Sequence, residues 1–274
     1  MRAGFDGSQR LFRIGVKPLD PLDWLLGGPD LPDALEEKAR LFATRRDEVF
    51  AAEPDTTAAQ GEVLDLVCAH LRCDPPATSE PPLLAAARLV AEDLLLLRRD
   101  AAGWRLVAAA LCFPSSWVLA EKLGLPIEAI HAPVPGFGAG TRNAALIARM
   151  FDAARPDTPM LRWNWSLYGD DRLFHPDLAP PQRFGSGPRA DPAFLRLERQ
   201  TLRRLPLSGD LLFTVRILID PLEALETAAD GPVIASALID QLAALDPAER
   251  DYKGLRHEHD RIIGRLAEIS DRRR

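Results

Sequence analysis

The feature that most restricts the fold of this sequence is a segment that alternates charged and apolar side chains, Leu195–Pro206. Five guanidinium or carboxylate groups fall between Arg196 and Arg204, and the apolar run Leu211–Ile219 follows after a short loop. This pattern predicts two strands of a hairpin. Burying an isolated charge costs on the order of several kcal/mol unless it is paired. The first strand must therefore face water on one side or line a polar pocket.

Alternation divides the polar residues of this strand between two faces. Successive side chains of a strand point in opposite directions, so the two sets separate as follows: Arg196, Glu198, Gln200 and Arg204 on one side, and Arg199, Thr201 and Arg203 on the other. One interpretation is an exposed ladder of ion pairs, each worth little stability. The other is a set of arginines that binds an anionic group through bidentate contacts.

Composition permits a large core and excludes several classes of protein. Hydrophobic residues make up 47% of the 274 and charged residues 27%, which is ordinary for a globular protein and allows a core that encloses a cofactor. The net charge of −6 argues against general binding of nucleic acid. The absence of a secretory segment or an apolar run of ~20 residues predicts a cytoplasmic protein with no membrane span. Three cysteines do not make a disulfide framework or a cluster site.

The order of predicted elements indicates an α+β fold. Two apolar runs, Ala91–Arg99 and Trp104–Phe113, read as a hairpin, and Leu161–Tyr168 reads as a strand with a clean alternation. Helical patterns dominate both ends of the chain. Because strands and helices do not alternate regularly, we expect an antiparallel sheet flanked by helices. The predicted division is an N-terminal helical arm (1–82), a core (83–220) and a C-terminal helical extension (221–274).

Several residues are candidates for chemistry on their local pattern. His131 lies between a short predicted helix and a loop stiffened by Pro133 and Pro135. That setting suits a fixed metal ligand, and it equally suits a loop histidine bonded to backbone. His175 is a second candidate for a pocket. In the strand 161–168, Trp163 and Trp165 share one face, and Asn164, Ser166 and Tyr168 share the other.

An ordered set of short motifs resembles the heme-dependent oxidative N-demethylase family. The motifs are Glu92–Leu97, Ala110–Trp117, Glu121–Gly124, Ile130–Pro135, Arg162–Trp165 and Leu197–Pro206. They span roughly residues 10–225. The resemblance implies a PAS-like sheet that encloses heme b. With the patterns above, it makes His131 the expected iron ligand. The remaining expected heme contacts are Arg196, Arg199 and Arg203 at the propionates, with Trp163, Trp165 and His175.

The resemblance also implies an activity and partners. The expected reaction is O2-dependent removal of a methyl group from a small secondary amine such as dimethylamine, with release of formaldehyde. Glu198 or Tyr168 is expected to hold the substrate cation. Electrons are expected from an external reductase subunit with flavin and iron–sulfur centres, linked to NADPH. Two alternatives remain open: a non-enzymatic PAS-type heme or small-ligand sensor, and a heme-free structural partner.

Overall fold

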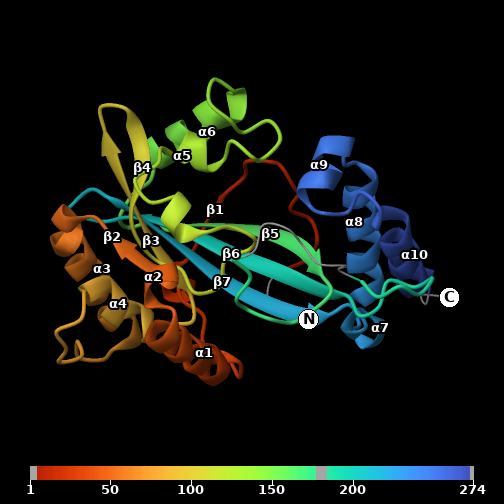
Figure 1. Ribbon diagram of the computed structural model, residues 1–274, viewed down its shortest axis with the longest axis horizontal. Helices are drawn as coiled ribbons and strands as arrows, with labels where there is room; N and C mark the ends of the chain where they lie inside the picture. Colours follow the sequence, from red (N-terminus) through yellow and green to blue (C-terminus); the bar gives the residue numbers. More distant parts are fainter. Residues whose placement is uncertain (1–4, 177–183, 272–274) are drawn as a thin grey trace.

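The computed structural model describes residues 5–176 and 184–271, which build one antiparallel sheet with helices around it (Figure 1). Its seven strands lie in the order β1-β5-β6-β7-β3-β4-β2. They are β1 (Lys17–Pro18), β2 (Phe50–Ala52), β3 (Asp93–Asp100), β4 (Gly103–Ala110), β5 (Met160–Tyr168), β6 (Phe194–Arg204) and β7 (Leu211–Pro221). The predicted α+β class is confirmed, and the likeness to a PAS domain stays a prediction.

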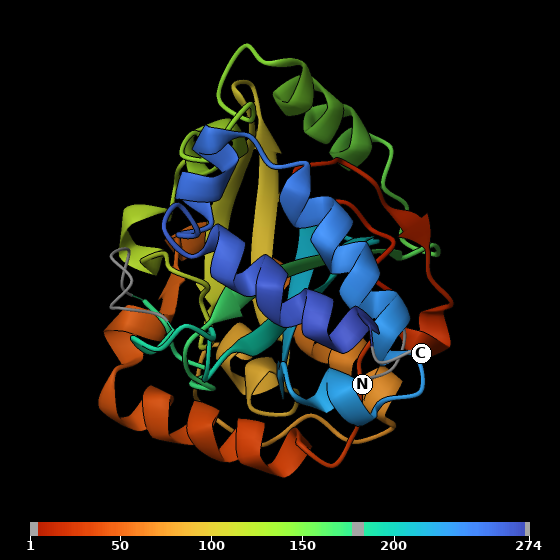
Figure 2. The same ribbon diagram turned by 90° about the vertical axis from the view of Figure 1, so that its right-hand side faces the viewer.

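The helices form three groups (Figure 1). The first group is α1 (Leu31–Thr44), α2 (Arg46–Val49), α3 (Thr57–Leu71) and α4 (Pro82–Ala87). The second is α5 (Ile127–Ile130) and α6 (Arg142–Asp152). The third is α7 (Ala224–Thr227), α8 (Gly231–Ala243), α9 (Pro247–Tyr252) and α10 (His259–Ser270). Figure 2 shows α8 and α10 crossing in front of the sheet.

Both predicted hairpins are present, and their register fixes the two faces of the sheet. In the first hairpin Asp100 pairs with Gly103, whose positive φ of 124° suits glycine in this tight turn. In the second, β6 and β7 pair along their whole length. On the other side of β6, Asn164 of β5 lies opposite Glu198. Directly paired residues lie on the same face of a sheet. The polar face of β5 that contains Asn164 is therefore continuous with the polar face of β6 that contains Glu198.

The two faces of the sheet are covered differently. On one face, Leu94 and Leu96 pack with α1, α3 and α4, while Trp163 and Trp165 pack with α8 and α10. On the opposite face, Leu95 and its neighbours meet α5 and α6. The N-terminal segment also contributes to the sheet, because β1 pairs with β5 and β2 with β4. The division of the chain into an arm, a core and an extension stays a prediction.

Residues 115–123, whose sequence predicts a helix, form only the 3-10 turn Leu119–Glu121. The backbone of Ser115 and Ser116 pairs with His175 instead, and Ser116 has a positive φ of 64°. A residue with this left-handed φ does not fit a right-handed helix, so a helix does not begin at Ser115.

No helix in the described ranges has the length and apolar character needed to cross a membrane.

The start of α6, which covers the second face, depends on a side-chain cap. The Thr141 hydroxyl accepts a hydrogen bond from the Ala144 amide at 3.1 Å and donates to the Gly138 carbonyl at 2.7 Å. We predict that Thr141→Ala lowers the free energy of unfolding by about 1 kcal/mol, because one N-terminal amide loses its acceptor. Urea unfolding measures this change. Thr141→Ser, which keeps the hydroxyl, is the control, and equal losses in both variants would contradict the capping role.

Candidate functional site

A cavity of about 590 Å³ lies between the sheet and the cover formed by α5, α6 and the loop 113–117. Its floor comes from alternate residues of β5, β6 and β7, with Leu95 and Leu97 from β3. The N-terminal segment 12–16 and the turn 251–254 close its sides. Most of the wall is apolar, and the polar side chains gather where β5 and β6 run side by side. This is the size and the mixed lining typical of a pocket for a cofactor or small ligand.

His131 lies in the wall of this cavity, at the end of α5. Its Nδ1 atom is fully buried and has no hydrogen-bond partner in the part of the chain that the structure describes. Its ring is tilted against Phe137 with the centroids 6.3 Å apart. Burial, with a smaller effect from the charge of Arg162, lowers the pKa of His131 to about 4, and the Ile127 carbonyl opposes the shift. The imidazole is therefore neutral at physiological pH, which is the form that binds metals.

Arg162 of β5 also lines the cavity. Its Nε atom is buried without an acceptor. Burial lowers the pKa of the guanidinium, and the charge of Glu198 partly offsets that effect. The charge of Arg162 therefore acts on the pKa of His131, and the charge of Glu198 acts on the pKa of Arg162.

Glu198 of β6 is a buried carboxylate held by neighbours on the cavity floor. Its Oε2 atom accepts hydrogen bonds from Asn164 at 3.1 Å and Gln200 at 2.7 Å. Burial opposes its ionisation, but the charge of Lys253 and hydrogen bonds from Ser115 and Asn164 outweigh burial and keep the pKa of Glu198 below its usual value. The cavity thus contains a fixed negative charge suited to a cation.

Lys253 reaches the cavity from the turn after α9, where it crosses the open edge of β5. Its Nζ atom donates to the Trp165 carbonyl at 2.7 Å and to the Ser166 hydroxyl at 3.1 Å. These contacts tie the C-terminal helices to the polar end of the cavity, next to Glu198.

Tyr168 lies at the end of β5 and lines the same cavity. Its hydroxyl is 3.1 Å from the Ser116 hydroxyl, and its ring lies 4.8 Å from the ring of His175. His175 is not part of the cavity wall, and its Nε2 atom lies 2.8 Å from Asp170 Oδ1. The structure therefore brings Tyr168 together with Glu198 and His131, and places His175 behind Tyr168.

Arg196 is on the same face as Glu198, but its guanidinium is already saturated. It is 1% exposed and donates to the carbonyls of Phe113 at 2.9 Å, Arg172 at 3.1 Å and Leu173 at 3.0 Å, and to the Ser115 hydroxyl at 3.0 Å. The same group stacks over the Tyr168 ring at 5.4 Å. Arg196 fixes two loops beside the cavity and has few donors left for a ligand.

Arg199 and Arg203 contact the N-terminal segment on the other side of the sheet. Arg199 donates to the Trp24 carbonyl at 2.9 Å, while Arg203 donates to the Pro156 carbonyl at 2.9 Å and stacks over the Trp24 ring at 5.1 Å. Neither residue lines the cavity. The two arginines hold the segment around Trp24 against β6.

Trp163 and Trp165 share a face, as alternation predicted, but it is the face opposite the cavity. Trp165 donates from Nε1 to Gln241 of α8 at 3.2 Å, and Trp163 meets Phe5 edge to face. Both belong to the core beneath α8 and α10. Their placement makes them part of the support of the floor, with β5 between them and the cavity.

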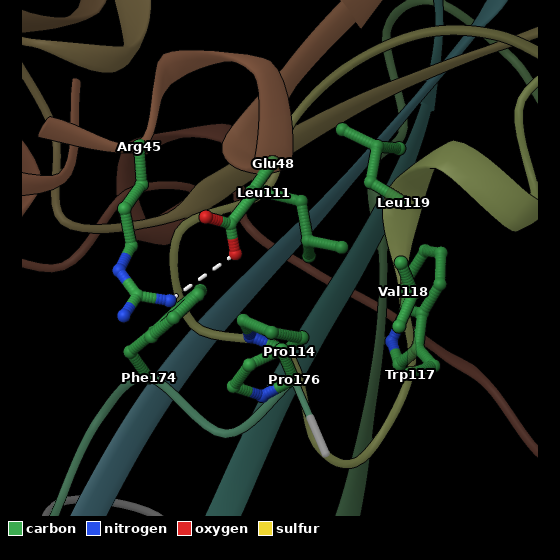
Figure 3. Close-up of a pocket in the computed structure, with 9 residues that line it drawn as sticks. All are labelled: Arg45, Glu48, Leu111, Pro114, Trp117, Val118, Leu119, Phe174 and Pro176. Atoms are coloured by element: carbon green, nitrogen blue, oxygen red, sulfur yellow. Dashed lines mark hydrogen bonds and ion pairs between the residues drawn. The ribbon is translucent and has the colours of Figure 1, made fainter. Parts of the chain in front are cut away.

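A smaller hollow of about 340 Å³ adjoins the main cavity (Figure 3). Leu111, Pro114 and Trp117 line both spaces. In Figure 3, Arg45 and Glu48 lie across the hollow from Trp117 and pair with each other at 3.2 Å. Because its charges are already paired, this hollow offers less to a ligand than the main cavity does.

Sequence reasoning did not select Arg162 and Lys253 as site residues. A signal existed for Arg162, because it alternates in phase with Asn164, Ser166 and Tyr168, the face that meets Glu198. Lys253 gave no such signal, since its position depends on how the C-terminal helices pass the edge of β5.

Comparison with protein families agrees with this geometry. A family model described as "Haem-dependent oxidative N-demethylase, alpha subunit-like" matches residues 71–263, well over half of the chain. The matched range includes the strands of the cavity floor, the helices α5 and α6 and Lys253. The chain therefore belongs to the haem-dependent oxidative N-demethylase alpha-subunit-like family.

Proposed function

We propose that this chain is the heme-binding catalytic subunit of an oxidative N-demethylase that acts on a small secondary amine such as dimethylamine. The observation that carries the proposal is the neutral His131 in the wall of a cavity of cofactor size, with a buried Nδ1 that has no hydrogen-bond partner among the described residues. Family membership supports the same assignment.

The residues present fit a heme group. Within the described ranges, no three His, Cys, Asp or Glu side chains come together as a site for a free ion. Heme needs less from the protein, because the porphyrin supplies the equatorial ligands and a single histidine completes the attachment. His131 supplies that ligand, and apolar side chains such as Ile130, Val134 and Phe137 surround it. We propose heme b, held without a covalent link.

The side chains of the cavity bind and orient the substrate and exclude water. When bound, heme supplies the redox chemistry by which O2 oxidises the methyl group that leaves as formaldehyde. The apolar cover keeps bulk water from the reacting groups. Glu198 accepts a hydrogen bond from the substrate ammonium and balances its charge, while the Tyr168 ring offers a cation–π contact. The amine is thereby oriented with its methyl group toward the apolar part of the cavity.

The proposed reaction requires a separate source of electrons. Converting dimethylamine and O2 to methylamine, formaldehyde and water consumes a pair of electrons and a pair of protons. The cysteines of this chain do not form a cluster site, since Cys68 and Cys112 are buried and Cys73 is exposed. The family description as an alpha subunit supports a partner. We propose that this partner is an NADPH-linked reductase with flavin and iron–sulfur centres.

We predict that His131→Ala lowers heme content by roughly tenfold or more, because the iron loses its protein ligand. Soret absorbance and the heme-to-protein ratio measure the loss. His131→Gly with added imidazole should regain a histidine-like spectrum. His175→Ala is the matched control and should keep its heme. An unchanged spectrum in both His131 variants would refute the ligand assignment.

The lowered pKa of His131 predicts a pH dependence of stability in the heme-free protein. Its unfolded value is near 6.5 and its folded value about 4, so the unfolded chain binds the proton first. The contribution of His131 to the free energy of unfolding is then fully present above pH 6.5. It falls by on the order of 2–3 kcal/mol between pH 6.5 and pH 4. Urea unfolding of the wild type and of His131→Gln across this range measures the difference. If the two proteins lose stability in parallel, His131 is not the titrating group.

The decisive assay for the proposed function combines heme-loaded protein, a reductant, O2 and dimethylamine, and measures formaldehyde. We predict that Glu198→Gln raises the apparent Kd for the amine by roughly tenfold or more, because a charge-assisted hydrogen bond is lost. Amine-induced shifts of the Soret band report binding separately from turnover.

Tyr168→Phe is the companion variant, since it keeps the aromatic face and should bind amine nearly as well as the wild type. Unaltered amine affinity in Glu198→Gln would make the carboxylate structural. Formaldehyde formed without a reductant would refute the proposed need for a partner. Heme that is bound and reduced, with no formaldehyde and no spectral response to amine, would favour a sensor.

A further inference from the structure

We propose that Arg162 is the principal anchor for an anionic group of the ligand in this cavity, namely a propionate carboxylate of heme. This inference rests on the proposed function. Arg162 is neither one of the residues that sequence reasoning assigned to the propionates nor part of a salt bridge within the fold.

The guanidinium of Arg162 lacks the partners that other buried arginines of this protein have. Within residues 5–176 and 184–271 no group accepts a hydrogen bond from it, and its Nε atom is fully enclosed. Arg196 and Arg204, on the neighbouring strand, each donate to several acceptors. Arg162 is half-buried overall, but its Nε is an enclosed donor without an acceptor. Leaving such a donor unsatisfied is costly, and a partner that the chain itself does not provide would remove that cost.

The surroundings of Arg162 place this missing partner inside the cavity. Arg162 lies opposite Gln200 in the β5–β6 register and lines the cavity along with His131. The carboxylate whose charge acts on the pKa of Arg162 is Glu198. That carboxylate is already held by Asn164 and Gln200. The free donors of Arg162 therefore remain for an acceptor that enters with the ligand.

Arg162 is better suited to this role than the lysines of the cavity wall, Lys122 and Lys253. The Lys253 ammonium is committed to the Trp165 carbonyl and the Ser166 hydroxyl. Lys122 is half-buried, as Arg162 is, but none of its side-chain atoms is among the enclosed donors without a partner in the described residues. A guanidinium also presents a rigid fork of donors that matches a carboxylate in a bidentate contact, which an ammonium does not.

The test compares iron protoporphyrin IX with its dimethyl ester, which has the same ring but no carboxylate charge. Soret titration of the heme-free full chain gives the affinity for each, and transfer of bound heme to a scavenging globin gives its release rate. The wild type should bind the free acid roughly tenfold to a hundredfold more tightly than the ester. In Arg162→Met this preference should fall to within about threefold, because only the free acid loses a partner.

Three variants keep the result interpretable. Arg162→Lys, which keeps the charge and loses the fork, should show an intermediate preference and remains informative if Arg162→Met does not fold. Lys122→Met should retain the wild-type preference, as should Arg142→Met, which removes an exposed arginine from the start of α6. The position of the Soret band should stay the same in all of them, since none changes the iron ligand.

Other outcomes overturn the inference in distinguishable ways. A wild type that binds acid and ester equally has no carboxylate anchor. A preference that survives in Arg162→Met and disappears in Lys122→Met assigns the contact to Lys122. If the wild type binds neither porphyrin, the proposed function itself fails. If heme still binds through His131 and both Arg162 variants keep the wild-type preference for the acid, the role of Arg162 is refuted and the proposed function is not affected.

Discussion

A guanidinium that leaves water must find acceptors, and this requirement organises the molecule around β6. The arginines of this central strand reach backbone carbonyls from distant parts of the chain: Arg196 holds the loops at 113–115 and 172–173, Arg199 holds the N-terminal segment at Trp24, and Arg204 holds the end of α6. Backbone carbonyls of loops are good acceptors for these arginines, because a buried loop carbonyl would otherwise lack a hydrogen-bond donor. A strand that looked too charged to enter a core is therefore the element to which the covering segments are attached.

The same contacts explain how a cavity persists beneath the cover. The loop 113–117 and the helix α6 are held at their ends by Arg196 and Arg204, so they do not have to collapse onto the sheet to bury their polar groups. Between these two attachments the floor carries Glu198, whose carboxylate accepts hydrogen bonds from Asn164 and Gln200. Fully satisfied polar networks of this kind are rigid. The cavity thus has a polar floor of fixed geometry and an apolar cover.

Much of this arrangement could be predicted from local patterns, and the rest depends on long-range packing. Alternation in 161–168 and 195–205 correctly separated the residues of β5 and β6 into two faces. Alternation does not say which face meets a cavity, which is why Trp163 and Trp165 were expected at the cofactor and lie beneath the floor instead. Nor does it show that the carbonyls near Trp24 occupy the donors of Arg199, because that contact joins residues far apart in the sequence.

The charges inside the cavity are consistent with a ligand that carries both a metal and carboxylates. Arg162 lowers the proton affinity of His131, but burial is the larger cause, so His131 stays neutral even when an anion balances Arg162. A carboxylate at Arg162 satisfies that guanidinium without competing for Glu198, which is held by its own donors and by the charge of Lys253. The negative charge of Glu198 then remains for a cationic substrate. In the function proposed above, Arg162 and Glu198 on the floor and His131 at the end of α5 let one cavity hold an anionic cofactor edge, a metal and an ammonium at the same time.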